Sequence, residues 1–431
     1  MRIFLTSWAA VYQTFDGKIR SYLSQFNRSL WALSAGLFVS SLGFAVSIPF
    51  IAIYFHSQLG LSLSEIGLFF GVMAVVRAFF QISGGELSDY IERRFLLIYS
   101  QVLRAGFFLF IGLAIYANWG FWVIGIGFLF SSIFGSIFYL TANAMVADVL
   151  PAEARLDGYA VARSAENLGW ALGPAIGGFL AEQSYGLLFA ISGAITLGSG
   201  TVFWIFFSPP KTALRKERFT LSDLISAKND PHLIAHCVLA FFLYLVVAQL
   251  IAPFSVYTVE IAKISKNELG FLYLLNGLMI VVLQVPVTRL LSRFKFTTQM
   301  ALGAFLYAVG YGMVGLHTGL FYFAWSISVI TLGEILISPP SLALTSGLAP
   351  HGRMGQYMGI FGFFLTSGWS LGPVYGGLVL DHFATNPAVA WVVISSLADL
   401  SGMGYLLFTK ILPERFNSGG RRDKATGRDR D

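Results

Sequence analysis

The chain is poor in charged residues and almost devoid of cysteine. Only 12% of its 431 residues are charged and 56% are hydrophobic, with a mean hydropathy of +0.71. This composition excludes a soluble protein with a single buried core, because so apolar a chain needs lipid as its solvent. The single Cys237 excludes an internal disulfide framework. The sequence also lacks a glycine-rich loop ending in Gly-Lys-Ser or Gly-Lys-Thr, which argues against direct coupling to ATP.

Other features that the sequence lacks further narrow the class of protein and its possible ligands. The net charge is +6, but the basic residues are spread along the chain, so we expect no nucleic-acid partner. His232 and His236 are four positions apart without an acidic or cysteine partner nearby, and we expect no metal site there. No constellation typical of a soluble enzyme occurs, so neither an enzymatic activity nor a bound cofactor is expected. The first 28 residues lack the short apolar core of a cleavable signal.

Long apolar segments dominate the rest of the sequence. A helix needs roughly 20 apolar residues to cross about 30 Å of hydrocarbon. Twelve segments qualify, near residues 29–56, 63–84, 94–116, 119–147, 157–181, 186–208, 232–257, 267–291, 297–317, 319–347, 353–381 and 387–410. Backbone polar groups cannot stay unpaired in lipid, so each segment is predicted to be helical. The predicted fold is an all-α integral membrane protein with twelve transmembrane helices.

Lysine and arginine predict the orientation of these helices. With the N-terminus placed in the cytoplasm, 23 of the 28 basic residues fall in cytoplasmic segments, two on the opposite side and three inside the spans. Basic residues are concentrated on the cytoplasmic side of membrane proteins. Both termini are therefore predicted to be cytoplasmic in a multi-pass protein of the plasma membrane, expected to be a bacterial inner membrane.

A hydrophilic break between the sixth and seventh segments divides the chain into two halves. The predicted organisation is a cytoplasmic segment 1–28, a six-helix bundle 29–208, a linker 209–231, a second six-helix bundle 232–410 and a tail 411–431. The first segment is either an amphipathic helix on the membrane surface or a frayed end. The tail is rich in Gly, Arg and Asp and is predicted to be disordered.

One ten-residue phrase occurs in both halves, 199 positions apart. It reads Gly-Trp-Ala-Leu-Gly-Pro-Ala-Ile-Gly-Gly at 169–178 and Gly-Trp-Ser-Leu-Gly-Pro-Val-Tyr-Gly-Gly at 368–377. Its shared residues are Gly169, Gly173, Pro174, Gly177 and Gly178 in the first copy and Gly368, Gly372, Pro373, Gly376 and Gly377 in the second. Glycines at this spacing predict a groove in which a neighbouring helix packs backbone to backbone. The repetition predicts two pseudo-symmetric bundles, an arrangement that transporters use for alternating access.

Two motifs carry a resemblance to the major facilitator superfamily. The loop after the second segment reads Gly-Glu-Leu-Ser-Asp-Tyr-Ile-Glu-Arg-Arg and resembles the cytoplasmic loop signature of that family, with Glu92 where the family has Gly. The matching residues are Gly85, Leu87, Asp89, Arg93 and Arg94. The first copy of the repeated phrase resembles the antiporter motif of drug:proton antiporters in the same superfamily. The resemblance implies that the loop latches the two halves in the outward-facing state.

Ionisable residues inside apolar segments are costly and are functional candidates. Glu334 lies centrally in the tenth segment with no cation in the same helix, and it is the first candidate for binding the coupling proton. Glu166 and then Asp399 are the next carboxylates to consider. A structural carboxyl group paired with an Arg or Ser of the other half remains the alternative for Glu334.

Several other polar residues lie in or beside the spans. Arg163, Glu166 and Asn167 follow one another near the start of the fifth segment, where Arg163 and Glu166 are spaced to neutralise each other. Asp148 is expected either to pair with a loop arginine or to be a solvated cap. Arg104 is expected to extend toward the cytoplasmic surface, and the deeper Arg77 to face the central cavity.

The resemblance and the residues together predict a secondary transporter. The expected function is proton-coupled efflux of hydrophobic or drug-like small molecules by a monomer that needs only an ion gradient and a lipid bilayer. Two alternatives stay open: a transporter of one metabolite, such as a sugar or a lysolipid, and a membrane receptor that transports nothing.

The orientation can be tested by labelling one introduced cysteine. In a Cys237→Ser background, Gln58→Cys lies in a segment predicted to face outside, so a membrane-impermeant maleimide should label it in intact cells. Lys410→Cys, predicted to be cytoplasmic, should be labelled only after lysis. The opposite pattern at the two positions would reverse the predicted orientation.

Overall fold

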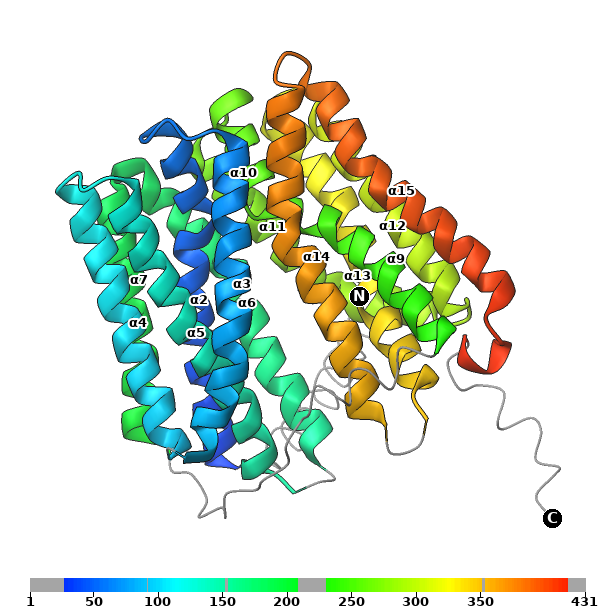
Figure 1. Ribbon diagram of the computed structural model, residues 1–431, viewed down its shortest axis with the longest axis horizontal. Coiled ribbons are helices and arrows are strands. Elements are labelled where there is room, and N and C mark those ends of the chain that lie inside the picture. Colours follow the sequence, from blue (N-terminus) through cyan, green and yellow to red (C-terminus); the bar gives the residue numbers. More distant parts are fainter. Residues whose placement is uncertain (1–26, 91, 152–153, 208–229, 351–352, 418–431) are drawn as a thin grey trace, which may run out of the picture.

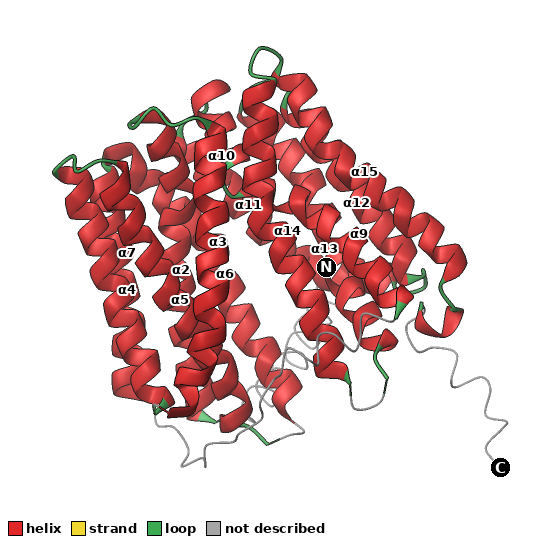
Figure 2. Ribbon diagram, viewed as in Figure 1, coloured by secondary structure: helices red, strands yellow, loops and turns green. Residues whose placement is uncertain are grey.

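The computed structural model is all-helical over the residues it describes, which are 27–90, 92–151, 154–207, 230–350 and 353–417 (Figure 2). The predicted segment before residue 27, most of the linker and the end of the tail lie outside these residues. Twelve long helices occur in the described part: α2 Arg28–Ser57, α3 Leu63–Tyr90, α4 Arg93–Tyr116, α5 Phe121–Val149, α6 Arg155–Gln183, α7 Tyr185–Phe206, α9 Pro231–Val247, α11 Lys266–Leu291, α12 Phe296–Val314, α13 Leu320–Leu348, α14 Met354–His382 and α15 Pro387–Ile411.

The seventh predicted segment differs from the prediction of one continuous helix. After α9 the chain forms a short 3₁₀ turn, the four-residue helix α10 Pro253–Val256 and a π turn over Tyr257–Ile261. Pro253 has no amide hydrogen and its ring crowds the preceding helical turn, which weakens a regular helix at this point. Gln249, one turn before the proline, donates hydrogen bonds to the carbonyls of Leu245 (2.6 Å) and Gly372 (2.9 Å) and so ties the break to α14.

The helices form two bundles, as the repeat predicts. Helices α2–α7 make one bundle and α9–α15 the other, and they stand side by side in Figure 1. Within the described residues, eight helical segments are long and apolar enough to cross a membrane by length and composition alone. The two bundles meet where α6 packs against α11 and α3 packs against α14.

Most glycines of the repeated phrase allow the first helix of each half to pack closely against the fifth. A Cβ atom at Gly169, Gly173 or Gly177 would lie within 2.6 Å of Phe38, Ala45 or Val46 on α2. In the second half, Gly368 meets α9 at Phe241 in the same way, and Gly372 and Gly376 meet the 3₁₀ turn after α9 at Ala248 and Gln249. The predicted groove is thus confirmed for the glycines spaced four residues apart, since only glycine allows these helices so close.

The last glycine of each phrase does not belong to that groove, contrary to the prediction. A Cβ atom at Gly178 would lie 2.4 Å from the carbonyl oxygen of Lys266 at the start of α11. One at Gly377 would lie 2.2 Å from the carbonyl oxygen of Leu63 at the start of α3. A glycine nine positions along a helix is rotated by about 180° from the first, at 100° per residue. It therefore faces the other bundle.

This packing predicts matched effects in the two halves. Gly173→Leu and Gly372→Leu each place a side chain against the backbone of the facing helix, so both should lower the thermal unfolding midpoint of the purified protein by several degrees. The control is Gly362→Leu on α14, where an added Cβ meets nothing within 4 Å. An effect confined to Gly173→Leu would contradict equivalent packing in the two halves.

Candidate transport site

The two bundles are joined at one end by a pair of equivalent contacts, which we call the clasp (Asp381 with the start of α3, Glu182 with the start of α11). Asp381 accepts hydrogen bonds from the backbone amides of Leu63 (3.2 Å) and Ser64 (2.7 Å), and Glu182 accepts one from the amide of Lys266 (2.7 Å). Each carboxylate thereby caps a helix that belongs to the other half, where the helix dipole favours negative charge. Glu182 and Asp381 are also 199 positions apart, so the repeated phrase extends to these residues.

Other contacts strengthen the clasp. The side-chain amine of Lys266 donates to the carbonyl of Ala181 (3.1 Å) and lies 4.4 Å from the ring centre of Tyr185. Toward the membrane interior, Gly67 and Gly270 pack against the carbonyl oxygens of Pro373 and Pro174. Among the described residues, every hydrogen bond between the halves lies in this clasp. The bundles spread apart toward the opposite end (Figure 1).

Glu334 lies beyond the clasp on the inner side of the second bundle. It is the central residue of α13 and is half-buried. Its carboxylate accepts a hydrogen bond of 3.3 Å from the side-chain amide of Asn276 on α11, which also donates to Thr331 at 2.8 Å. Among the described residues no cation pairs with it. Its hydrogen-bond partner thus comes from its own half, and the alternative of a structural pair with an Arg or Ser across the interface finds no support in the described residues.

Arg163 and Glu166 form the opposing polar group on the first bundle. The Arg163 guanidinium donates to Glu166 at 3.1 Å and to the hydroxyl of Tyr139 on α5 at 2.7 Å. The Arg163 side chain is 62% exposed and that of Glu166 only 13%, so the arginine faces open space. Asn167, next in the chain, is exposed as well. The pairing expected from the i, i+3 spacing is present.

Tyr244 on α9 lies within electrostatic range of both polar groups. It is close enough to both Glu334 and Arg163 for their charges to act on its hydroxyl. Sequence reasoning missed this residue because tyrosines are frequent in membrane helices and nothing in the local pattern marks it. Tyr244 is thus a further polar residue of this central region.

Two aromatic pairs flank the polar groups, one in each half. Trp170 packs edge-on against Phe44 with ring centres 5.7 Å apart, and Trp369 lies 6.5 Å from Tyr244. The tryptophans belong to the two copies of the repeated phrase, and their partners are 200 positions apart on α2 and α9. This near-identical spacing was a signal available in the sequence. The pairs give the central region aromatic surfaces for a greasy solute.

The intramembrane arginines lie in the first bundle. Arg104 is buried, with 6% of its surface exposed, so the predicted extension to the cytoplasmic surface is wrong. Its guanidinium lies 4.6 Å from the ring centre of Phe44 and donates to the Ser40 hydroxyl at 3.3 Å, and Gly135 leaves the space for it. These inward partners keep the side chain in the bundle. Arg77 on α3 is half-buried and lies close enough to Arg104 for the two charges to repel.

The loop motif is only partly described. Gly85, Leu87 and Asp89 belong to the end of α3, but their side chains lie outside the description, so the proposed latch stays a prediction. Arg93 forms an ion pair with Asp148 on α5, which is the first of the two alternatives for that aspartate. Arg94 donates to the carbonyl of Trp204 at 2.8 Å. Both arginines thus hold α4 to other helices of the same bundle.

Two further polar residues lie away from the interface between the halves. Asp399 is half-buried on α15, which packs against α12, α9 and α14 of its own bundle.

Both ring nitrogens of His236 are within hydrogen-bond distance of protein groups: Tyr405 at 3.1 Å, and Ser341 and Thr345 at 3.2 Å. His236 also stacks on Phe361 with ring centres 4.8 Å apart. The hydrogen-bonding positions of its ring thus join α9 to α13 and α15.

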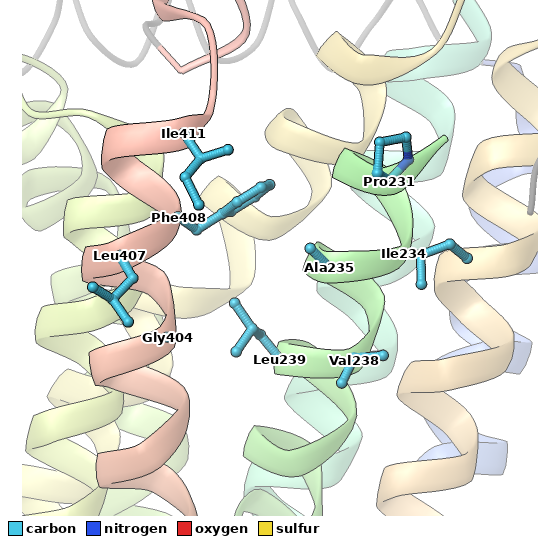
Figure 3. Close-up of a pocket in the computed structure, with 9 residues that line it drawn as sticks. All are labelled: Pro231, Ile234, Ala235, Val238, Leu239, Gly404, Leu407, Phe408 and Ile411. Carbon is cyan, nitrogen blue, oxygen red and sulfur yellow. The ribbon is translucent and has the colours of Figure 1, made fainter. Parts of the chain in front are cut away.

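A surface groove between α9 and α15 is a poorer candidate for a substrate site than the polar and aromatic residues described above. Figure 3 shows its lining, which is apolar throughout: Pro231, Ile234, Ala235, Val238, Leu239, Gly404, Leu407, Phe408 and Ile411. A specific solute site needs a few placed polar groups. The groove has none among its lining side chains and suits contact with lipid.

A comparison with protein families agrees with this architecture. A family model described as Major Facilitator Superfamily matches residues 33–373, most of the chain. The chain belongs to the major facilitator superfamily. It is accordingly a multi-pass membrane transporter that moves a small-molecule substrate across a lipid bilayer.

Individual relatives within the superfamily are distant. The chain is 25% identical to the uncharacterised transporter YttB of Bacillus subtilis (strain 168), covering 87% of this chain and 94% of that protein. It is 23% identical to a Na(+), Li(+), K(+)/H(+) antiporter of Planococcus maritimus, covering 91% and 98%. It is 22% identical to the multidrug resistance protein MdtH of Shigella boydii serotype 4 (strain Sb227), covering 82% and 87%.

Solved structures agree on the fold of this superfamily member. A peptide transporter POT in complex with sulfate matches with a TM-score of 0.75 at 15% identity, covering 91% of this chain and 96% of that one. A bacterial homolog of the human lysosomal transporter Spinster, in an inward-facing and occupied conformation, matches with a TM-score of 0.67 at 16% identity, covering 93% and 99%. At such identities the likeness shows the fold alone.

From the geometry of the clasp we predict that Asp381 and Glu182 hold this end closed. Asp381→Asn combined with Glu182→Gln weakens charge-assisted hydrogen bonds, each worth about 1.5–3 kcal/mol and less where solvent reaches them. The population separated at this end should therefore rise roughly tenfold. Double electron–electron resonance between spin labels at Gln58 and Ala384, in a Cys237→Ser background, measures that population.

Glu65→Gln is the matched control for the clasp. Glu65 also accepts a hydrogen bond at the start of α3, but from Ser62 of its own bundle, at 2.8 Å. This control should leave the label distances unchanged. Unchanged distances in the Asp381→Asn, Glu182→Gln variant as well would show that the carboxylates do not hold the halves together.

Proposed function

We propose that the protein exports hydrophobic, drug-like small molecules by alternating access, in exchange for protons. The export is driven by the proton gradient across a bacterial inner membrane, with no further cofactor. The protein works as a monomer with both termini in the cytoplasm. The observation that carries the proposal is the position of Glu334 at the centre of α13, with an amide for a partner and no cation among the described residues.

The surroundings of Glu334 suit a group that binds and releases a proton. An ionised carboxylate in a low-dielectric site is costly unless a cation or several donors stabilise it. Asn276 offers one donor to the carboxylate, which stabilises the ionised form only in part. When water reaches the site, ionisation is favoured; when the site closes, protonation is favoured. A change of access therefore changes the protonation of Glu334.

The arrangement of the bundles supplies the change of access. The clasp closes one end, and the polar and aromatic residues lie beyond it, where the bundles spread apart. With the orientation proposed from the basic residues, the closed end faces outside and the site is reached from the cytoplasm. A solute would enter between Trp170 and Trp369, and rocking of the halves would open the clasp to release it.

The distant relatives support the two finer parts of the proposal. A cation/proton antiporter and a multidrug resistance protein both match over most of their length. At 22–23% identity these matches suggest proton coupling and broad specificity for this chain. The paired aromatic surfaces at Phe44, Trp170, Tyr244 and Trp369 agree with a solute bound mainly through apolar contact.

Replacing Glu334 with Gln tests the coupling. Gln mimics the protonated carboxyl permanently, so proton-driven efflux of ethidium, Nile red and fluorescein from everted membrane vesicles should fall at least roughly tenfold. Downhill exchange of the same dyes should continue, because the neutral amide of the Glu334→Gln variant still allows the halves to rock without proton exchange. Glu334→Asp should keep part of the activity with a shifted pH optimum.

Asp399→Asn is the matched control for this experiment. It removes another intramembrane carboxylate, but from α15 at the outside of the bundle, and should leave gradient-driven efflux within about twofold of the unmodified protein. Full gradient-driven efflux by Glu334→Gln would place the proton elsewhere, with Glu166 as the next residue to replace. Uptake or efflux of a single solute only would instead favour the metabolite transporter.

A further inference from the structure

The intramembrane charges of the two halves are opposite in sign. Away from the helix ends, the first bundle contains Arg77, Arg104 and Arg163 against one carboxylate, Glu166, which is paired with Arg163. The second bundle contains Glu334 and Asp399 and no cation at comparable depth. A proton can neutralise each carboxylate of the second bundle, but an arginine stays charged in a protein. Arg77 and Arg104 therefore need a different explanation.

The nearby helices offer these two arginines no anionic partner. Helices α2, α4 and α7 contain no Asp or Glu, and Asp148, the one carboxylate of α5, pairs with Arg93. Along α3, Glu86 is nine residues from Arg77, which corresponds to about 13 Å along the helix axis. Among the described residues, Arg77 has neither an ion-pair nor a hydrogen-bond partner. Two neighbouring cations without a counter-charge are costly in the membrane.

Arg104 is held firmly but is incompletely satisfied. Its Nε atom is buried without a hydrogen-bond partner among the described residues, as is Oε1 of Gln101, one turn before it. Gln101 and Arg104 both donate to the hydroxyl of Ser40, at 2.8 and 3.3 Å. A guanidinium has five donors. The packing thus fixes the charge in place while its hydrogen-bonding capacity stays partly unused.

Arg104 lies behind one of the aromatic pairs. The guanidinium of Arg104 lies against the ring of Phe44, and Phe44 in turn contacts Trp170, which is 38% exposed. Arg77 is six residues past Gly71, the last glycine of α3 that packs against α14 among the described residues. It is therefore about 9 Å beyond that contact along the helix, on the part of α3 where the bundles spread apart.

We propose that Arg77 and Arg104 form a subsite for an acidic group of the transported molecule, a carboxylate, sulfonate or phosphate, with Phe44 and Trp170 holding its aromatic part. Arg77, the more accessible residue, contacts the acid directly. Arg104 adds its charge from behind the Phe44 ring, where the low dielectric strengthens the attraction. The ligand's identity as the transported molecule rests on the proposed function. The preferred substrates are then aromatic acids.

A series of ligands with one ring system tests the subsite. Naphthoate, naphthalenesulfonate, naphthamide and naphthyl-trimethylammonium are titrated into the purified full-length protein, with dissociation constants from equilibrium dialysis. The two acids should bind at least roughly tenfold more tightly than the amide, because a charge-assisted hydrogen bond is worth more than a neutral one. Equal binding of acids and amide would overturn the proposal.

Substitutions assign the preference to the two arginines. Arg77→Gln should reduce the ratio of acid to amide affinity to about one, and Arg77→Lys should keep most of it. Arg104→Gln should reduce the ratio in part. Arg293 is an exposed arginine in the turn after α11, so Arg293→Gln is the matched control and should leave the ratio unchanged. An unchanged ratio in Arg77→Gln would overturn the proposal.

The ligand-free protein separates binding from a structural role. Removing one of two repelling, unpaired cations should leave the thermal unfolding midpoint of Arg104→Gln equal to or above that of the unmodified protein. A lower midpoint with equal loss of acid and amide binding would mark Arg104 as structural and overturn its part in the subsite. Acid-selective binding without proton-driven efflux would contradict only the proposed function. Efflux without acid preference would contradict only the subsite.

Discussion

Close approach of helix backbones governs this structure. In lipid there is little hydrophobic gain from bringing two helices together, so contact has to come from packing and hydrogen bonds. Here glycines at 169, 173 and 177, and again at 368, 372 and 376, bring the fifth helix of each half against the first. That packing fixes Trp170 against Phe44 and Trp369 against Tyr244. It also turns the last glycine of each phrase toward the other bundle, where the clasp forms. The aromatic surfaces and the closed end are consequences of one repeated pattern.

The sequence predicts the fold almost completely because membrane helices obey a simple rule of length and polarity. The twelve predicted spans agree with the twelve long helices to within a few residues, except where α3 extends to Tyr90 and where Pro253 interrupts the seventh span. The break was missed because Pro49 and Pro174, equally visible in the sequence, lie inside continuous helices. Whether a proline ends a helix depends on partners for the freed backbone groups, which are supplied by tertiary contacts.

The candidate site could be predicted only in part, for the same reason. Glu334 stands out because a carboxylate at the centre of an apolar helix is rare, and the Arg163–Glu166 pair follows from local spacing. The local sequence does not distinguish Tyr244 and Asn276 from other polar residues, because only the packing of α9 and α11 brings them near Glu334. The inward course of Arg104 is likewise set by Ser40, Phe44 and Gly135, residues of two other helices. Side-chain direction in a bundle is not encoded by one helix alone.

The clasp has a consequence for how such a protein changes over evolutionary time. Asp381 and Glu182 bind backbone amides, which every residue except proline supplies. A substitution at Leu63, Ser64 or Lys266 therefore leaves the acceptor's partner in place, and no compensating change is needed on the opposite helix. A side-chain ion pair at the same location would tie two positions together. The clasp can keep its hydrogen bonds while the residues around it diverge. Co-varying sequence positions would therefore fail to reveal this contact between the halves.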